Sequence, residues 1–206
     1  MPRQNRVMPA GEIVATPERG TLMGNRGLLH DGDGRIIRLW RERRWIICLL
    51  RFKGRRRQVM SPGLYTELFF LDEATALAAG HRPCAECRRE RFVAFRDAWL
   101  RGNGGGGPVT ASDIDRRLHA ERLGPGGTKR TYQAGLDGLP GGVFVRLPGD
   151  ERPWLLWNGL LLAWSAGGYR ERVRRPRGVE VAVLTPPSTV AAVRGGYAPQ
   201  VHGSAG

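Results

Sequence analysis

The protein is a chain of 206 residues, 41% of them hydrophobic, with a formal net charge of +14 at pH 7. This length allows one large domain or two small ones, and the longest apolar runs fall far short of the roughly 20 residues of a membrane-spanning helix. The excess charge is concentrated in residues 1–60, which hold 14 Lys or Arg against 5 Asp or Glu. Such a field predicts a polyanionic partner, and the alternative is a protein that is simply basic.

Cysteine usage bears on the compartment. The chain has three cysteines, an odd number, and residues 1–6 show no signal-peptide pattern. Reduced thiols or a bound metal fit these features better than a disulfide framework. We therefore expect a cytoplasmic protein with no membrane partner.

The first elements predicted along the chain are β-strands. Residues 1–20 contain three prolines and no sustained period, so they are expected to form an arm or an irregular edge. Two apolar runs, Ile36–Trp40 and Trp45–Leu50, flank the loop Arg41–Arg44 and predict a β-hairpin. The period of two places Cys48 on the apolar face of its strand, so its thiol is expected in the core.

Basic residues surround the turns of this region. A third strand is predicted at Arg55–Met60, and Trp40, Trp45 or Phe52 could stack on bases. The predicted nucleic-acid contacts are Arg41, Arg43, Arg44, Arg51, Lys53, Arg55, Arg56 and Arg57. The alternative is a solvated strand edge whose charge discourages aggregation. The sequence has no recognition-helix motif, so sequence-specific readout is not predicted.

The next stretch predicts a strand, a short helix and a cysteine-bearing turn. Tyr65–Leu71 reads as a strand, Asp72 is a good N-cap, and Gly80 suits a left-handed helix end. Cys84 and Cys87 follow on a turn with two intervening residues. That spacing brings two sulfurs to one tetrahedral metal ion.

The other ligands of this metal site are less determined by spacing. Cys48 could be a third ligand or a small buried apolar residue. His30, which follows a turn, and His81, three residues before Cys84, compete for the remaining position. His81 could instead pack as an aromatic residue, and His30 could be solvated. Zinc is the favoured metal, in a structural rather than a catalytic role.

A family resemblance appears around the two cysteines. Residues 68–87 resemble the second half of the zinc-binding domain of Ada-type DNA methylphosphotriester repair proteins, and the matching residues are Phe69-Phe70, Glu73-Ala74 and Ala78-Ala79-Gly80-His81-Arg82-Pro83-Cys84-x-x-Cys87. The resemblance implies a zinc knuckle between a phenylalanine strand and a helix, in a DNA-binding protein. That family has four cysteine ligands, one of which accepts a methyl group. This chain has only Cys48 upstream of the pair, and His81 stands where the family has an aromatic residue.

Two helices are predicted after the cysteines. The first is amphipathic, Arg88–Leu100, with Phe92, Phe95 and Trp99 expected to face the core. The glycine-rich run 101–110 that follows it is typical of an interdomain linker.

The second helix is expected from Asp113 to Leu123, with Ser112 as its cap. On it Asp115 and His119 lie one turn apart and could form a general acid–base pair. An exposed helix carrying an ordinary i,i+4 pair is the favoured alternative.

The remaining residues predict an antiparallel β-meander with short helices. Its strands are Val143–Leu147, Trp154–Trp157, Leu160–Trp164 and Val179–Leu184. Asn158-Gly159 predicts a type I′ hairpin turn, and Ser188 could cap a final helix, Thr189–Arg194.

Together these elements predict an α+β protein. Residues 1–100 are expected to form a zinc-knuckle module with basic hairpins, 101–110 a linker, and 111–206 a helix and β-meander module. We expect a zinc-binding protein that engages DNA or RNA through its arginine-rich half. Two alternatives stay open. One is a nucleic-acid repair or processing enzyme that uses a zinc-activated Cys84 or Cys87, or the Asp115/His119 pair; the other is a protein-interaction module with a structural zinc.

Overall fold

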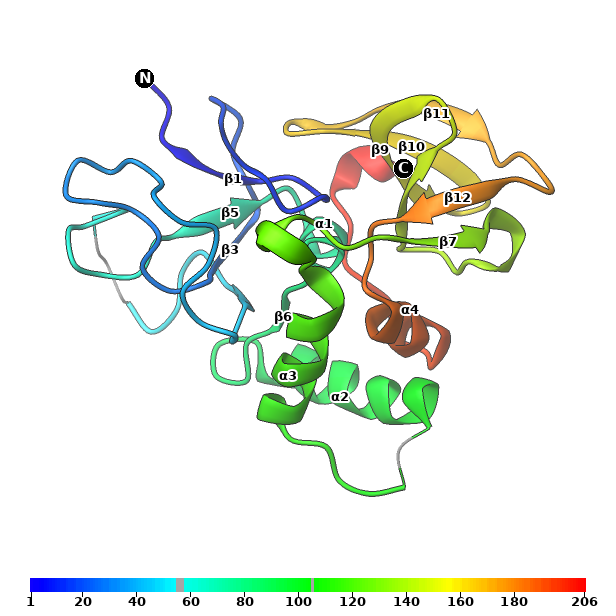
Figure 1. The fold of residues 1–206 in the computed structure, drawn as a ribbon, viewed down its shortest axis with the longest axis horizontal. Helices are drawn as coiled ribbons and strands as arrows, with labels where there is room; N and C mark the ends of the chain where they lie inside the picture. Colours follow the sequence, from blue (N-terminus) through cyan, green and yellow to red (C-terminus); the bar gives the residue numbers. More distant parts are fainter. Residues whose placement is uncertain (55–57, 105) are drawn as a thin grey trace.

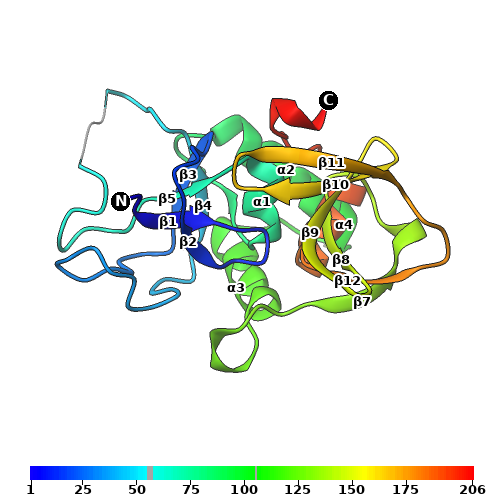
Figure 2. The same cartoon turned by 90° about the horizontal axis from the view of Figure 1, so that it is seen from above.

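The computed structural model describes residues 1–54, 58–104 and 106–206. They form two six-stranded sheets, the first at the blue and cyan end of the chain and the second at the yellow and orange end (Figure 1). Helices lie between the sheets when the molecule is seen from above (Figure 2). The predicted α+β class is confirmed. Among the described residues, no helix has both the length and the apolar character needed to cross a membrane.

The first sheet is mixed. Its strands are β1 (Gln4–Val7), β2 (Ile13–Ala15), β3 (Leu22–Asn25), β4 (Ile46–Cys48), β5 (Leu68–Phe70) and β6 (Arg82–Pro83), in the order β2-β1-β5-β3-β4-β6. Of the two alternatives predicted for residues 1–20, the structure has the irregular edge and not the arm: β1 and β2 pair as an antiparallel hairpin at one side of the sheet, with a shift of register between Gln4 and Arg6. Val7 and Ile13 are buried on it, and Gly11 turns the chain with a φ of 95°.

The hairpin predicted between Ile36–Trp40 and Trp45–Leu50 is also wrong. β4 pairs instead with β3 and, in parallel, with β6, whereas Ile36 makes only an isolated bridge with His30. β3 and β6 therefore pair with the two edges of β4, and the predicted local partner, Ile36–Trp40, lies outside the sheet. The burial of Cys48 is confirmed, since 8% of it is exposed. Of the third strand predicted at Arg55–Met60, residues 55–57 lie outside the described residues, and the rest is not a strand.

In the described part of the chain, four α-helices accompany the sheets: α1 (Glu73–Ala78), α2 (Arg89–Asn103), α3 (Ala111–Arg122) and α4 (Pro187–Arg194). Asp72 caps α1 as predicted, accepting a hydrogen bond of 2.8 Å from the Thr75 amide. The cap predicted for α3 is wrong: Thr110 takes that place in a reciprocal capping box with Asp113. Ser188 likewise lies inside α4 rather than capping it.

The second sheet is antiparallel throughout. Its strands are β7 (Tyr132–Gly135), β8 (Phe144–Leu147), β9 (Asp150–Trp157), β10 (Leu160–Ser165), β11 (Gly168–Arg174) and β12 (Glu180–Val183), in the order β11-β10-β9-β8-β12-β7. Short 3-10 turns lie at Pro125–Gly127, Leu136–Gly138 and Gly203–Ala205. The predicted turn between β9 and β10 is confirmed, because Asn158 and Gly159 both have positive φ, 48° and 76°.

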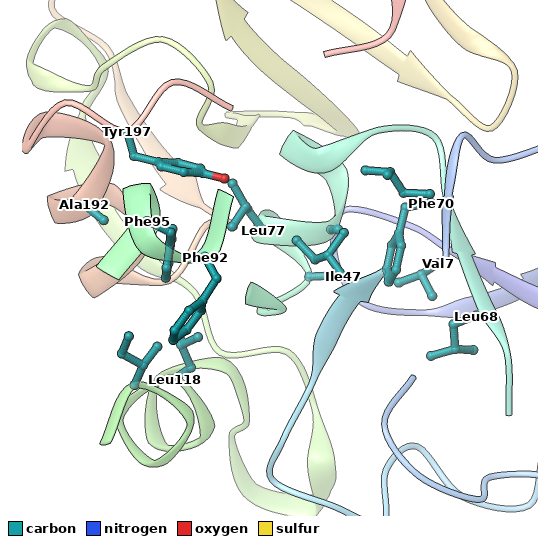
Figure 3. Close-up of a cluster of buried hydrophobic side chains, with 14 of the residues drawn as sticks. Val7, Ile47, Leu68, Phe70, Leu77, Phe92, Phe95, Leu118, Ala192 and Tyr197 are labelled. Atoms are coloured by element: carbon teal, nitrogen blue, oxygen red, sulfur yellow. The ribbon is translucent and has the colours of Figure 1, made fainter. Parts of the chain in front are cut away.

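Hydrophobic side chains from the N-terminal and C-terminal parts of the chain pack in a common core. Phe92 and Phe95 of α2 are buried with Ile47 and Phe70 of the first sheet and with Tyr197 near the C-terminus (Figure 3). α2 and α4 pack so closely that a Cβ on Gly102 would fall 1.9 Å from the Ala191 carbonyl oxygen. Residues before and after the predicted linker, 101–110, therefore pack against one another.

Two adjacent buried carboxylates fasten the C-terminal segment to α1. Asp72 accepts hydrogen bonds from the Tyr169 phenol at 2.7 Å and from the His202 amide at 3.0 Å. Glu73 accepts them from the Tyr197 phenol at 2.6 Å and from the backbone N–H of residue 200 at 2.9 Å. The end of the chain is thereby part of the structure that holds the knuckle in place.

Candidate metal centre and adjoining groove

The three cysteines lie together. Their Sγ atoms are all within 4.8 Å of one another, and no other His, Cys, Asp or Glu of the described residues joins the group. Parallel pairing of β4 with β6 brings them together, because the Cys84 amide donates to the Ile47 carbonyl at 2.9 Å, next to Cys48. Sulfurs around a tetrahedral zinc, at Zn–S distances of about 2.3 Å, are about 3.8 Å apart. The group could hold a metal ion.

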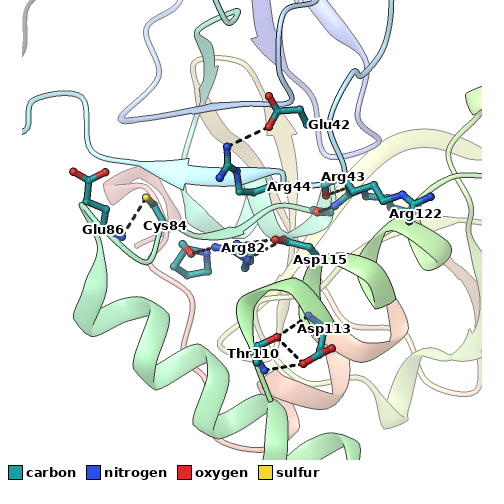
Figure 4. A network of polar contacts seen from close by, with 12 residues as sticks. Glu42, Arg43, Arg44, Arg82, Cys84, Glu86, Thr110, Asp113, Asp115 and Arg122 are labelled. Carbon is teal, nitrogen blue, oxygen red and sulfur yellow. Dashed lines mark hydrogen bonds and ion pairs between the residues drawn. The ribbon is translucent and has the colours of Figure 1, made fainter. Parts of the chain in front are cut away.

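The knuckle also provides hydrogen-bond donors to sulfur. The Glu86 amide donates to the Cys84 Sγ at 3.4 Å (Figure 4). The side-chain contacts with Cys48 and Cys87 lower the pKa of Cys84, and the reciprocal contact raises the pKa of Cys48. All three thiols are free. A thiolate at Cys84 is thus stabilised by its surroundings, which is the protonation state that metal binding requires.

The two histidines predicted as competing ligands have other partners. His30 is buried in a loop, where its Nδ1 lies 2.6 Å from the Thr66 hydroxyl and its Nε2 lies 3.2 Å from the Ser61 carbonyl. His81 packs edge-on against Phe70 with ring centroids 4.7 Å apart, and its Nε2 accepts a hydrogen bond from Arg26. Burial, followed by the charge of Arg26, lowers the pKa of His81 well below its usual range. His81 therefore packs as an aromatic residue, which is the alternative to metal binding that the sequence left open.

The cysteines open onto a groove of about 860 Å³. Its floor is one face of the first sheet, because alternate residues of neighbouring strands lie side by side. Phe69, Met23 and Cys48 form one cross-strand row, and Asn25, Ile46 and Arg82 form the next. All six line the groove, as do Cys84, Cys87 and the aromatic side chains Phe52 and Tyr65.

A buried carboxylate also lines the groove. Glu67 is 2% exposed, and its Oε2 accepts a hydrogen bond of 2.7 Å from the Met60 amide. Its Oε1 has no hydrogen-bond partner among the described residues. An unsatisfied buried acceptor is costly, so it is a feature that a ligand donor would complete. Sequence reasoning missed Glu67, although an acidic residue next to the apolar run Leu68–Phe70 was a visible signal.

The described residues among the predicted nucleic-acid contacts are exposed side chains of two loops. Arg41, Arg43, Arg44, Arg51 and Lys53 are all exposed, and Arg44 and Arg51 line the groove. Arg55, Arg56 and Arg57 lie outside the described residues. Among the aromatic residues considered for stacking, Trp45 is 2% exposed and has Arg26 and Arg122 over its ring. It is a core residue and cannot stack on a base.

The predicted acid–base pair of Asp115 and His119 is not formed. Both carboxylate oxygens of Asp115 accept hydrogen bonds from Arg82 (Figure 4). His119 instead contacts Trp40, with ring centroids 4.6 Å apart, and lies 3.3 Å from Arg122. Asp115 therefore belongs to the wall of the groove, and His119 to a different surface.

Comparison with known proteins adds no assignment. No family model, curated protein or solved structure matches the chain. The resemblance of residues 68–87 to Ada-type domains stays a prediction, and the function has to be inferred from the cysteine cluster and the groove.

Proposed function

We propose that the three cysteines bind a zinc ion and that the groove beside them binds nucleic acid. The observation that carries the proposal is the convergence of three thiols from two distant segments, Cys48 on β4 and Cys84 and Cys87 on the knuckle, within 4.8 Å. Thiolate ligands favour zinc over the harder divalent ions. Unpaired thiols and a thiolate metal site also fit a reducing cytoplasm.

The ligand count suggests how this ion would be coordinated. A tetrahedral ion has four positions, and the described residues supply three thiol ligands. The fourth position would take water or a ligand from the groove, since all three cysteines line it. The sequence predicted a purely structural site, and the three-ligand set favours a site with one exchangeable position.

The nucleic-acid part of the proposal depends on charge and shape. Arg44 and Arg51 line the groove, and Arg41, Arg43 and Lys53 are exposed on the adjoining loops. Cations of this kind bind phosphates, and aromatic side chains on the groove wall offer surfaces to bases. A groove of about 860 Å³ has room for unstacked bases, which favours a single strand over a duplex.

Metal content tests the first part. Purified protein should contain close to one zinc per chain, and Cys84→Ser should lower the content strongly. Ser112→Ala, which changes a groove residue outside the cysteine group, is the matched control and should leave it unchanged. Zinc well below stoichiometry in the unmodified protein would contradict the proposal.

A salt series tests the second part. The logarithm of the affinity for a random single-stranded oligonucleotide should fall linearly with the logarithm of salt concentration. Arg51→Ala should weaken binding and reduce the slope by about one. Arg174→Ala removes an equal charge from an exposed position of β11 and should change the affinity and the slope much less. An affinity insensitive to salt would remove the nucleic-acid proposal.

The exchangeable position also favours a second candidate, a nucleic-acid repair enzyme that uses a zinc-activated cysteine. Cys87 is the most accessible of the three cysteines. Zinc-loaded protein incubated with methylphosphotriester DNA should then gain one methyl group on a cysteine, detected by peptide mass analysis. Unmodified cysteines after prolonged incubation would leave the binding function and exclude this transfer.

A further inference from the structure

A second cavity lies on the opposite side of β3 and β4 from the groove. Successive residues of a strand point to opposite faces, so Arg26 and Trp45 face this cavity, whereas their neighbours Asn25 and Ile46 face the groove. The cavity has a volume of about 310 Å³. It is far too small for a strand of nucleic acid, and it contains none of the three cysteines.

Three cationic side chains converge on this pocket: Arg26, Arg122 and Lys129. The two guanidinium groups lie over the Trp45 ring, 4.1 and 3.7 Å from its centroid. Each arginine is 1% exposed, whereas Lys129 is only partly buried. The arginines therefore form a fixed positive floor, and the lysine is the cation that a ligand can reach.

Among the described residues, little acidic charge lies close to these three cations. Glu12 is the one acidic residue among the described lining residues, and it is exposed, with a carboxylate oxygen 3.9 Å from Arg146. Arg26 hydrogen-bonds to the neutral His81 and to backbone carbonyls rather than to a carboxylate. Its Nη2, and the Nε of Arg122, have no hydrogen-bond partner among the described residues.

A structural role explains part of the arrangement. Arg122 donates to the Gly80 carbonyl at 2.8 Å and Lys129 to the Ala78 carbonyl at 2.5 Å, so both satisfy acceptors at the C-terminal end of α1. Arg122 also donates to the Arg43 carbonyl at 2.6 Å, but neutral carbonyl acceptors leave the positive charges of both side chains uncompensated. Burial, followed by the charges of Arg26 and Arg122, lowers the pKa of Lys129 to about 7. The site is thus electrostatically costly as it stands, and an anion would relieve that cost.

We propose that this pocket binds a small dianion, the phosphate group of a phosphorylated molecule. Three cations facing one acidic residue favour two negative charges over one. Lys129 would contact the phosphate directly as a point charge, and the buried arginines would act through their field. The apolar lining, which includes Leu39 and Leu123, suits the carbon skeleton that carries the phosphate. The source could be a small phosphomonoester or the terminal phosphate of an oligonucleotide.

Calorimetry with inorganic phosphate at constant ionic strength tests the pocket in the full-length protein. Phosphate should bind measurably better than acetate, and Lys129→Gln should weaken it by about tenfold or more. Arg130→Gln removes an equal charge from the next, exposed position and should have little effect. Lys129→Arg should retain binding. Equal affinity in the Lys129→Gln and Arg130→Gln proteins, or phosphate no better than acetate, would overturn the proposal.

A second variant covers the case in which Lys129→Gln destabilises the fold. Leu39 is 46% exposed at the pocket, so Leu39→Glu adds a carboxylate there without disturbing the core. It should weaken phosphate binding, whereas Leu39→Gln should not, and identical binding by both would contradict the proposal. Comparing 5′-phosphorylated and 5′-hydroxyl oligonucleotides identifies the source. If the protein prefers the 5′-phosphorylated oligonucleotide and Lys129→Gln loses this preference, the pocket binds a terminal phosphate. If the protein binds inorganic phosphate but shows no preference between the two oligonucleotides, the pocket binds a small phosphorylated molecule.

Discussion

Arg82 and Asp115 form a bidentate ion pair in the wall of the groove. The guanidinium Nε and Nη2 donate to the two carboxylate oxygens at 2.9 and 2.8 Å, and the side chains are 3% and 10% exposed. Arg82 belongs to β6, directly before the cysteine knuckle, and Asp115 belongs to α3. The pair therefore ties the cysteine cluster to the helix that follows the glycine-rich run.

Breaking this pair should lower the stability of the folded protein. Asp115→Leu leaves the Arg82 charge buried without its partner, and we expect a loss of about 3–5 kcal/mol in the free energy of unfolding. The double variant Arg82→Met with Asp115→Leu should recover much of that loss, since no unpaired charge remains. Urea unfolding measures both. As a control, Arg116→Ala removes the ion-pair partner of Asp113 from an exposed position and should cost far less; a similar loss there would contradict the argument.

Metal removal should destabilise the sheet edge at β4 and β6. The three thiols lie at the junction of these strands, and a bound ion stabilises the folded state by its own binding free energy. A strong chelator should therefore lower the melting temperature of the native protein. The Cys48→Ser protein should start lower and respond little to chelator. An equal response of both proteins would place the metal elsewhere.

The stability of the protein should depend on pH through Lys129. Its pKa is lowered to about 7 in the folded state by burial, Arg26 and Arg122, against opposing Glu12, with Arg146 adding to the lowering. Between pH 7 and about 9 the unfolded chain holds this proton and the folded protein releases it, so stability should rise with pH. Lys129→Met should remove that rise, and guanidinium denaturation at several pH values compares the two proteins. Parallel pH profiles would show that Lys129 titrates normally.

Glu67 should determine which bases bind best in the groove. Its Oε1, for which the described residues provide no hydrogen-bond partner, can accept a hydrogen bond from an amino group such as that of cytosine or guanine. Glu67→Gln should reduce the preference for such bases over thymine in single-stranded homopolymers, by roughly 1–3 kcal/mol. The salt dependence should stay the same, because the phosphate contacts are unchanged. A uniform loss of affinity for every base would indicate a structural role for Glu67 instead.

Local features of the sequence were predicted well. The Asp72 cap, the left-handed Gly80, the inward face of α2 and the Asn158-Gly159 turn each depend on residues within a few positions of one another. Short-range steric and hydrogen-bonding preferences determine such features. The C-terminal meander was recognised for the same reason, apart from β7 and β11, which carry few apolar residues.

Long-range pairing could not be predicted in this way. β4 was given a neighbouring partner in the sequence, but its partners are β3 and β6, whose residues lie 20 or more positions away. The choice depends on total burial, because Ile47 is fully buried between them. The same pairing brought Cys48 to the knuckle, a result that spacing alone left open. The anion pocket was invisible for the same reason, since Arg26, Arg122 and Lys129 come together only in three dimensions.

The buried carboxylates of Asp72 and Glu73 have a consequence for how the protein is made. Their partners Tyr197 and His202 leave the ribosome more than a hundred residues after α1 does. Until then Asp72 has only its hydrogen bonds with Thr75, and Glu73 only its ion pairs with Arg88 and Arg91. The remaining contacts of these two carboxylates should therefore form only after residues 197–202 have been synthesised, and α1 should be fully packed only then.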